Sequence, residues 1–353
     1  MYARLGGALG VPHHSYQDSA HRTMQRAFTA AHAAARAIAT RSSSGHVPLP
    51  IVYHPLYSAP RFKEGHTFPM QVFERIHERL LDRGIVHPSQ VHCPDVMPTA
   101  AQLHLAHCPD YVAAFRGGTL GDKELRRIGF PWSEVLVERT ESEVAGTLLT
   151  ARLALQHGIA CNTAGGTHHA HRDFGSGFCI FNDLAVTARL LLGEGLVSRV
   201  LVLDLDVHQG DGTAAILQGD DRVFTLSVHC QDNFPARKQA SDLDVGLRSG
   251  AGDAEYMRAI SEVVPGALQD FRPDLVLYDA GVDVHAKDKL GRLELSDEGL
   301  RRREMLVLDT CMGMGIPVAG YVGGGYDADL DVLADRHIHL HEAATELFRD
   351  HRL

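Results

Sequence analysis

Residues 199–212 read Arg-Val-Leu-Val-Leu-Asp-Leu-Asp-Val-His-Gln-Gly-Asp-Gly, and this stretch decides the fold class. Its nearly continuous apolar run over 199–207 is typical of a strand that is buried on both faces of a sheet. Asp204, Asp206 and His208 interrupt the run only toward its end. Because side chains alternate along extended backbone, these three point to the same side. The stretch therefore predicts a core strand whose carboxyl end carries polar, reactive groups.

Further apolar runs of this kind recur along the chain, and most are separated by longer amphipathic stretches. Short buried strands alternating with helices predict an α/β fold, here a single domain with one mainly parallel sheet and helices on both faces. Ligands bind such sheets beyond the carboxyl ends of the strands, so we expect the active site there. The other predicted strands are Pro50–Tyr53, Ile159–Asn162, Arg222–His229, Asp274–Ala280 and Ile316–Val322, and the predicted helices are Phe68–Asp82, Trp132–His157, Asp183–Glu194, Asp253–Gln269, Asp297–Met312 and Asp327–Arg349.

The composition indicates a large folded unit with excess negative charge. The 353 residues are 44% apolar and carry a net charge of −10, and their six cysteines include no Cys-x-x-Cys pair. Scattered cysteines disfavour a disulfide scaffold and fit an intracellular chain. We find no apolar run of about 18 residues, so no membrane span is expected. An acidic body repels a phosphate backbone, so direct nucleic-acid binding is not expected either.

Residues 1–46 differ from the rest of the chain. They contain five arginines and one acidic residue, a net charge of +4, so residues 47–353 carry −14. An Ala-rich helix is predicted over Thr23–Thr40, and the absence of an apolar core argues against a secretory signal. Two interpretations stay open, a disordered extension and a mitochondrial or plastid transit peptide. The folded domain is expected over residues 47–353, located in the cytoplasm, the nucleus or both, or in one of these organelles if the extension is a transit peptide.

Unusual residues follow four of the predicted strands. They are the His-His pair of Gly165–Ala170, the acidic and imidazole residues of Asp204–Gly212, Asp283, and the tyrosine that ends Gly323–Tyr326. One such loop would be ordinary, but four of them at the same edge of a parallel sheet predict a site.

A divalent metal centre is the first element of this site. Asp206, His208 and Asp283 can supply three ligands and leave a position open, which is the pattern of a catalytic zinc site. Taken alone, Asp206 and His208 could instead cap a helix that begins near Asp211.

Two histidines form the second element. Water that attacks an acyl carbon needs a base, and the departing nitrogen needs an acid, roles that His168 and His169 can fill. Each ring also needs a carboxylate on its other nitrogen, and Asp204 and Asp211 are at hand. The alternatives for the two histidines are a second metal site or buried structural imidazoles.

Tyr326 is the third element, because a phenol at a glycine-rich turn can donate to an oxyanion. Alone, the same sequence would be read as a tight turn. The glycines are not followed by Lys-Ser/Thr, so they do not form a phosphate loop, and no Gly-x-Ser-x-Gly elbow indicates a serine hydrolase.

With these motifs the chain resembles the zinc-dependent histone deacetylase family, which has the arginase/deacetylase fold. The resemblance runs from about Leu49 to the C-terminus, so it implies a deacetylase-like catalytic domain over residues 47–353. Three segments look most like the class IV branch and its bacterial relatives. The motifs are Gly165–Ala170, Gly177–Asp183, Asp204–Gly212, Ala280–Asp283 and Gly323–Tyr326, and the class IV segments are Tyr53–Pro55, His66–Pro69 and Asp288–Gly291.

The resemblance implies a role for each site residue. Asp206, His208 and Asp283 would hold one zinc ion per chain. His168 would be oriented by Asp204 and His169 by Asp211, with His169 as general base, and Tyr326 would polarise the acyl carbonyl. The implied substrate-binding residues are Phe178 and Phe234, as opposite walls of an acyl-lysine tunnel, with Gly177 and Gly324.

Two further statements about cations follow from the resemblance. Asp204 and Ser227 match positions that help to hold a structural potassium ion in relatives. The related ureohydrolases bind two manganese ions through an Asp-x-His-x-Asp segment, whose last position is Gly210 here, so one metal is expected.

The implied activity is hydrolysis of acetyl or longer acyl groups from N6-acyl-lysine of histones or other proteins. Class IV relatives suggest that long acyl chains are accepted. Two alternatives stay open: a deacetylase of a small acetylated amine such as acetylpolyamine, and a catalytically silent acyl-lysine or partner-binding module. The sequence does not indicate an oligomeric state.

Several residues stay ambiguous. His171 fits either a surface position or the lining of the site's entrance. His337 and His341 would share one helix face beside His339, a spacing that could bind adventitious metal, but such a cluster is more often a solvated face and is expected to be one here. Cys179 is expected to be a small buried residue.

Overall fold

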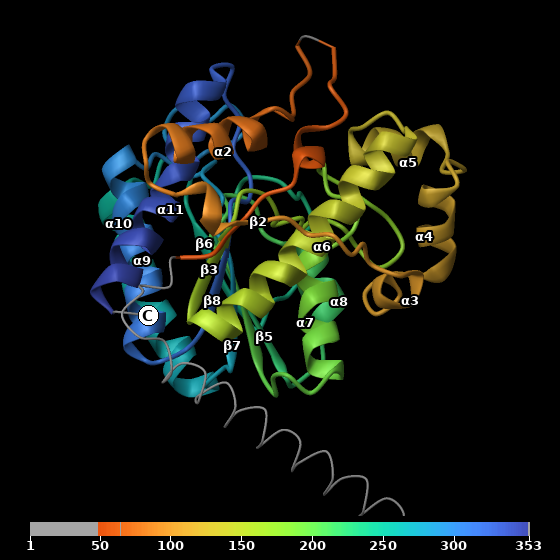
Figure 1. Cartoon of the computed structure of the whole chain (residues 1–353). Helices are drawn as coiled ribbons and strands as arrows, with labels where there is room; N and C mark the ends of the chain where they lie inside the picture. Colours follow the sequence, from red (N-terminus) through yellow and green to blue (C-terminus); the bar gives the residue numbers. More distant parts are fainter. Residues whose placement is uncertain (1–48, 64, 352–353) are drawn as a thin grey trace, which may run out of the picture. The chain divides into compact units, whose positions relative to one another are not determined.

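The computed structural model of the chain describes residues 49–63 and 65–351 (Figure 1). The expected extension over residues 1–46 and its helix over Thr23–Thr40 lie outside the described residues. In the part that is described, no helix is long and apolar enough to cross a membrane.

Within the described residues, eight strands form one sheet in which each neighbouring pair is parallel. The strands are β1 (Ile51–Val52), β2 (Val91–His92), β3 (Ile159–Asn162), β4 (Val200–Asp204), β5 (Val223–Cys230), β6 (Leu243–Leu247), β7 (Leu275–Asp279) and β8 (Val318–Tyr321). Their order across the sheet is β2-β1-β3-β8-β7-β4-β5-β6. The predicted fold class is therefore confirmed.

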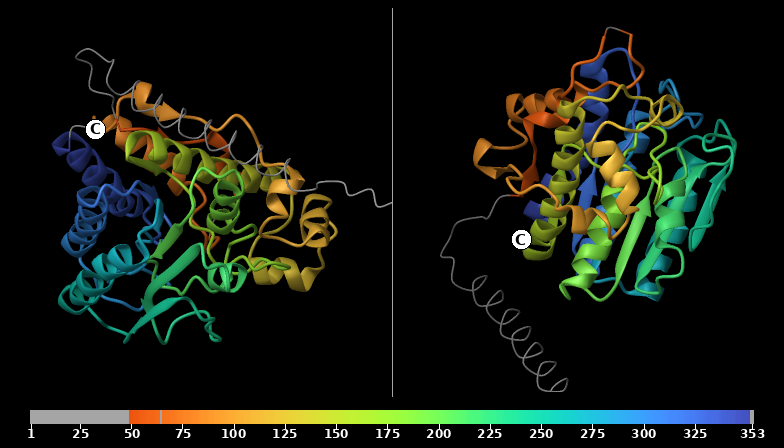
Figure 2. Two further views of the ribbon diagram at one scale, coloured as in Figure 1. Left: turned by 90° about the horizontal axis from the view of Figure 1, so that it is seen from below. Right: turned by 90° about the vertical axis from the view of Figure 1, so that its right-hand side faces the viewer.

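Different helices cover the two faces of the sheet (Figures 1 and 2). The helices are α2 (Val72–Asp82), α3 (Ala100–Leu103), α4 (Pro109–Arg116), α5 (Asp122–Ile128), α6 (Glu134–His157), α7 (Asp183–Gly193), α8 (Asp211–Leu217), α9 (Asp253–Phe271), α10 (Asp297–Gly313) and α11 (Leu330–Asp350). On one face α6 lies against β1, β3 and β8, while α7 and α8 contact β4 and β5. On the other, α11 and α10 contact β3 and β8, with α2 against α11 and α9 against α10.

The six predicted strands are all present. Their apolar runs fit a sheet that helices cover on both faces, because both sides of each central strand are buried. Each residue of β3, β4, β7 and β8 is buried. The six predicted helices are also present, with ends shifted by at most four residues, as at α2, which begins at Val72 rather than Phe68.

The sequence interpretation missed the elements that lack a long periodic pattern. β6 lies at the sheet edge and alternates half-buried and exposed side chains, so it has no continuous apolar run. β2 has only two residues, and α3, α4 and α5 have eight or fewer. The helix start near Asp211, considered above, is that of α8.

The topology brings the four unusual loops together. They follow β3, β8, β7 and β4, which are consecutive neighbours at the centre of the sheet. Since all four strands are parallel, their carboxyl ends meet at one edge. The backbone thus brings the four loops to the edge at which the site is expected.

Candidate metal centre and acid–base site

Asp206, His208 and Asp283 lie together at this edge. Nδ1 of His208 is 3.0 Å from Oδ1 of Asp206 and 3.1 Å from Oδ2 of Asp283. All three side chains are buried, and Oδ2 of Asp283 has no hydrogen-bond partner among the described residues. Burial and the nearby Asp206 raise the pKa of Asp283 to about 7. Two buried carboxylates beside an imidazole form a nitrogen and oxygen donor set that fits zinc.

Backbone groups hold the two carboxylates in place. The amide of Val207 donates to Oδ1 of Asp283 at 2.8 Å, and that of Gly324 donates to Oδ2 of Asp206 at 2.9 Å. A Cβ on Gly324 would lie 2.5 Å from oxygens of both side chains. Only glycine therefore fits position 324, which the structure places against the candidate metal ligands.

The paired histidines lie beside this trio, each with the carboxylate expected from the sequence. Nδ1 of His168 is 2.9 Å from Oδ2 of Asp204, and Nδ1 of His169 is 2.7 Å from Oδ1 of Asp211. The ring centroids of the two histidines are 4.1 Å apart. Both Nδ1 atoms are engaged, and Nε2 of His168 lies 3.8 Å from Oδ1 of Asp206, so Nε2 of His169 is the ring nitrogen more available to a substrate.

The environments of the two rings push their pKa values in opposite directions. Burial opposes the charge on His168, but Asp204 and Asp206 outweigh it, and the pKa of His168 stands well above its usual value. Burial and the neighbouring charge of His168 lower the pKa of His169 to about 3. These opposite shifts favour a charged His168 and a neutral His169 at neutral pH. Such a division between acid and base is typical of catalytic pairs.

The turn that carries these histidines is fixed by Asp183, at the start of α7. Its carboxylate accepts hydrogen bonds from the amides of Gly166 and Thr167, at 3.1 and 2.9 Å, and from both Thr147 Oγ1 and Thr167 Oγ1. Gly166 has a φ of +91°, and a Cβ there would lie 2.7 Å from Asp279. Asp183 lies inside a motif quoted from the sequence, but sequence reasoning gave it no role.

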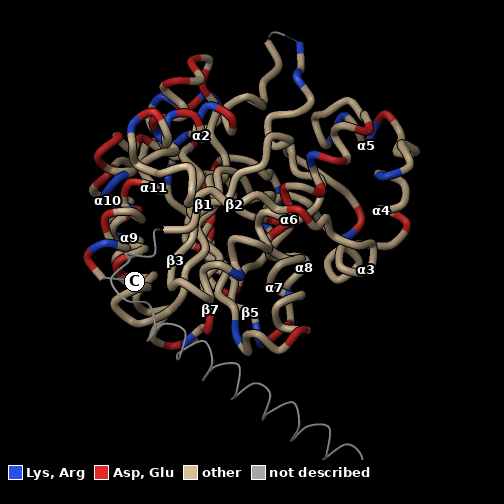
Figure 3. The backbone as a smooth tube through the Cα atoms, in the orientation of Figure 1, with Lys and Arg blue, Asp and Glu red and all other residues tan. Residues whose placement is uncertain are grey.

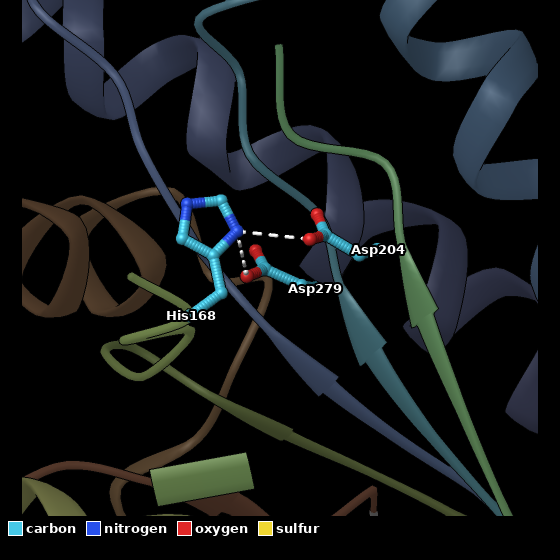
Figure 4. Close-up of side chains that lie close together, drawn as sticks. All are labelled: His168, Asp204 and Asp279. Atoms are coloured by element: carbon cyan, nitrogen blue, oxygen red, sulfur yellow. Dashed lines mark hydrogen bonds and ion pairs between the residues drawn. The ribbon is translucent and has the colours of Figure 1, made fainter. Parts of the chain in front are cut away.

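Asp279, at the end of β7, is a second residue that sequence reasoning missed. Oδ2 of Asp279 lies 3.6 Å from Nδ1 of His168, so two carboxylates face one ring nitrogen (Figure 4). Asp279 is fully buried, and neither of its carboxylate oxygens has a hydrogen-bond partner among the residues described. Burial and the charge of Asp204 raise the pKa of Asp279 well above its usual value. Burial also raises the pKa of Asp204, but Asp204 accepts the hydrogen bond of His168, which favours its ionised form over that of Asp279.

Tyr326 points into the same region from the loop after β8. Its ring is 7% exposed and lies 5.9 Å, between centroids, from the ring of Phe178. Its backbone amide donates to Oδ2 of Asp288 at 2.6 Å, and Asp288 also accepts from the amides of Leu290 and Gly291. Burial and the charge of Asp283 raise the pKa of Tyr326 well above its usual value, so the phenol stays protonated and can donate.

A funnel of about 650 Å³ leads to these groups from outside. Phe178 and Phe234 line it together with Tyr326, His169 and His208. Phe234 is 42% exposed and meets His169 edge to face at a centroid distance of 4.8 Å. A Cβ on Gly177 would lie 2.8 Å from the ring of His169 and 3.2 Å from Phe234, so glycine keeps this passage open.

Behind the funnel lies a smaller cavity of about 40 Å³, lined by both paired histidines and Tyr326. Its lining also includes Arg139 and Glu143 of α6, a buried ion pair whose two hydrogen bonds are 2.6 and 2.8 Å long. Sequence reasoning did not single out this pair.

The expectation of a solvated face for His337 and His341 is wrong. They are 2% and 0% exposed, because this face of α11 is the one turned to the protein interior. Nε2 of His337 would lie 2.8 Å from a Cβ on Gly325, so His337 supports the glycine turn before Tyr326. His339 alone of the three is half-exposed.

The structure also shows the surroundings of His171 and Cys179. His171 is half-buried, and its Nε2 lies 3.1 Å from Oδ2 of Asp211, so Asp211 contacts both His171 and His169. Cys179 is buried, as expected.

Fold and site together define a class of protein, a parallel α/β protein with a candidate metal centre and an acid–base pair at the carboxyl ends of its central strands. Residues 66–340 match the histone deacetylase domain family. The chain belongs to this histone deacetylase family, whose members are hydrolases, and the resemblance inferred from the sequence is confirmed.

Individual relatives agree with this assignment. An uncharacterized protein of Picosynechococcus sp. is 52% identical over 85% of this chain and 99% of its own length. Histone deacetylase 2 of Arabidopsis thaliana is 30% identical over 76% of this chain and 72% of its own. The acetoin utilization protein AcuC of Staphylococcus aureus is 30% identical over 76% and 74%. The crystal structure of the HDA15 HD domain matches the fold with a TM-score of 0.71 at 20% identity, over 85% of this chain and 90% of that chain.

Proposed function

We propose that this protein is a zinc-dependent lysine deacylase that hydrolyses N6-acyl-lysine, above all N6-acetyl-lysine, in proteins or peptides. The observation that carries the proposal is the His168–His169 pair, each ring hydrogen-bonded through Nδ1 to a buried carboxylate, beside three buried candidate metal ligands. Membership of the family and the funnel above the site support it.

Asp206, His208 and Asp283 would hold the zinc ion. A bound zinc ion supplies Lewis acidity to the acyl carbonyl and to the attacking water. The further steps belong to side chains of this chain.

His169 acts as the general base. Asp211 holds the proton on Nδ1, so Nε2 accepts a proton from water as the water oxygen attacks the carbonyl carbon. The same Nε2 then returns the proton to the lysine nitrogen as the carbon–nitrogen bond breaks. His168 stays charged and stabilises the negative charge that develops nearby, and Tyr326 donates its phenol hydrogen to the oxyanion.

A structural potassium ion is part of the proposal. Asp204 and Ser227 are register partners on β4 and β5, and both side chains are buried. Buried oxygens from adjacent strands suit a monovalent cation, as the resemblance implied.

The test compares substrates with zinc-loaded protein. We expect acetate release from an acetyl-lysine peptide and little from an acetylated polyamine at equal concentration. Release from the polyamine alone would keep the chemistry but assign a small-amine substrate. No release from either, with bound zinc measured in the same sample, would instead favour a silent binding module.

A further inference from the structure

The mouth of the funnel has a consistent charge. Apart from its histidines, the charged residues that line it are Arg127, Lys289 and Arg292, and its lining includes no acidic residue. We call these three exposed side chains the cationic rim. They stand out because residues 47–353 carry a net charge of −14.

The cationic rim lacks internal charge partners. Among the described residues, no carboxylate lies within 4.0 Å of the charged groups of Arg127, Lys289 or Arg292, although surface arginines such as Arg152 and Arg222 form ion pairs. Along outer helices such as α2 and α10, acidic and basic residues are interspersed (Figure 3). The rim is therefore left free to pair with charges from outside.

The rim residues do contact neighbouring groups, but these contacts leave their charges exposed. The guanidinium of Arg127 lies over the ring of Phe174 at 3.9 Å. Arg292 donates to the backbone carbonyl of Asp232 at 2.8 Å.

The backbone ties the rim to the reaction centre. The amide of Lys289 donates to the carbonyl of Tyr326 at 3.0 Å, and the amide of Gly177 donates to the carbonyl of Arg127 at 3.2 Å. Asn233, next to Phe234, donates to the carbonyl of Leu290 at 2.9 Å. The three cations thus line the funnel through which a lysine side chain would enter, near the residues that flank that lysine.

We propose that the cationic rim of Arg127, Lys289 and Arg292 selects acyl-lysine in peptide or protein segments with acidic residues on either side. This inference rests on the proposed function. Acidic flanks gain attraction to the rim, whereas basic flanks and polyamines are repelled.

The experiment uses the full zinc-loaded chain and three peptides with the same central acetyl-lysine. Their flanks are Asp and Glu, Ala, or Lys and Arg. An uncharged acetyl-lysine amide without flanks is the fourth substrate. We expect kcat/KM to be about tenfold higher for the acidic than for the basic peptide at low salt, and the ratio to shrink as salt screens the rim.

Variants assign the effect to the rim. Arg127→Ala, Lys289→Glu and Arg292→Ala are each expected to lower the acidic-to-basic ratio, and the three together to bring it to one or below. Lys289→Arg should keep it. Arg258→Ala, on α9 away from the funnel, removes an exposed arginine and should leave the ratio unchanged.

The failures are distinguishable. Equal kcat/KM for the three peptides, or a ratio that the triple variant does not change, overturns the rim proposal and leaves the deacylase intact. No hydrolysis of any peptide or of the uncharged amide overturns both.

Discussion

Asp279 and Asp204 approach the same atom of His168, its Nδ1, from two neighbouring strands, at 3.6 and 2.9 Å. Only Asp204 forms a hydrogen bond with the ring. A buried carboxylate without donors is costly to ionise, so we expect the proton on Asp279 and the charge on Asp204.

This asymmetry predicts different effects of two matched substitutions. Asp204→Asn removes the ionised partner of His168 and should lower kcat on an acetyl-lysine peptide by about 10–100-fold. Asp279→Asn replaces one neutral group with another of the same shape, and should change kcat less than about threefold, below the range of a lost charged partner. Steady-state kinetics with equal zinc loading checks both. If Asp279→Asn were the more damaging change, the assignment of charge would be reversed.

Tyr326→Phe should remove the oxyanion donor alone. Its backbone remains held by Asp288, so the fold and the bound zinc should be unchanged. The loss of one oxyanion donor predicts a fall in kcat of about 10²–10³-fold. Turnover, metal content and thermal unfolding are measured on one preparation. Full activity of this variant would refute the role of the phenol.

Asp283→Ala should lose the metal. It removes one of three ligands and leaves the buried Asp206 and His208 without the third donor. We expect the zinc content after dialysis to fall from about one per chain toward zero, as measured by mass spectrometry, with Tyr326→Phe as the zinc-retaining control. Stoichiometric zinc in Asp283→Ala would show that the ion lies elsewhere.

The inner cavity predicts the acyl preference. Its volume of about 40 Å³ and its lining by the buried Arg139–Glu143 pair leave room for an acetyl group but not for a long chain. We therefore expect kcat/KM for an acetyl-lysine peptide to exceed that for the myristoyl peptide by at least about tenfold. A myristoyl preference would contradict this prediction and would mean that the Arg139–Glu143 pair moves aside. It would agree instead with the acceptance of long acyl chains that the class IV relatives suggest.

His107 predicts how stability depends on pH. Its Nε2 accepts the amide of Asn182 at 2.8 Å and its Nδ1 faces the carbonyl of His171 at 3.0 Å, a pattern that only the neutral ring satisfies. Burial lowers the pKa of His107 to about 4. The unfolded chain takes up this proton near pH 6.5, so the contribution is complete above that pH and is lost as the pH falls toward 4.

Urea unfolding between pH 7 and 5 measures this loss. His107 alone accounts for up to about 1.4 kcal/mol per pH unit below pH 6.5. A His107→Phe variant, less stable at pH 7, should show a shallower slope by that amount. Parallel slopes for the two proteins would mean that His107 titrates normally in the fold.

The parts of the site that the sequence could predict are those at strand ends. Asp204, Asp206 and His208 interrupt an apolar run, so both the strand and its reactive end are visible. The expected common side does not extend to all three, because β4 ends at Asp204, and Asp206 and His208 follow it in bends. His168 and His169 follow the pair Gly165-Gly166 after one residue, a visible sign of a tight turn, and both glycines have positive φ angles in the structure.

Other residues carry no such signal. Asp279 lies within a predicted strand, and only the pairing of β7 with β4 brings it to His168. Arg139 and Glu143 have the spacing of an ordinary surface ion pair on a helix, and only packing shows that they are buried. The burial of His337 and His341 likewise depends on which face of α11 meets the sheet. These contacts arise from tertiary packing, which neither periodicity nor motif spacing records.

The most direct test of the central claim is a zinc titration of the chelated protein, with acetate release from an acetyl-lysine peptide as the readout. The account predicts no release by the metal-free protein and a linear rise that ends near one zinc per chain. Undiminished release by metal-free protein, or no release by the zinc-saturated protein, would contradict it.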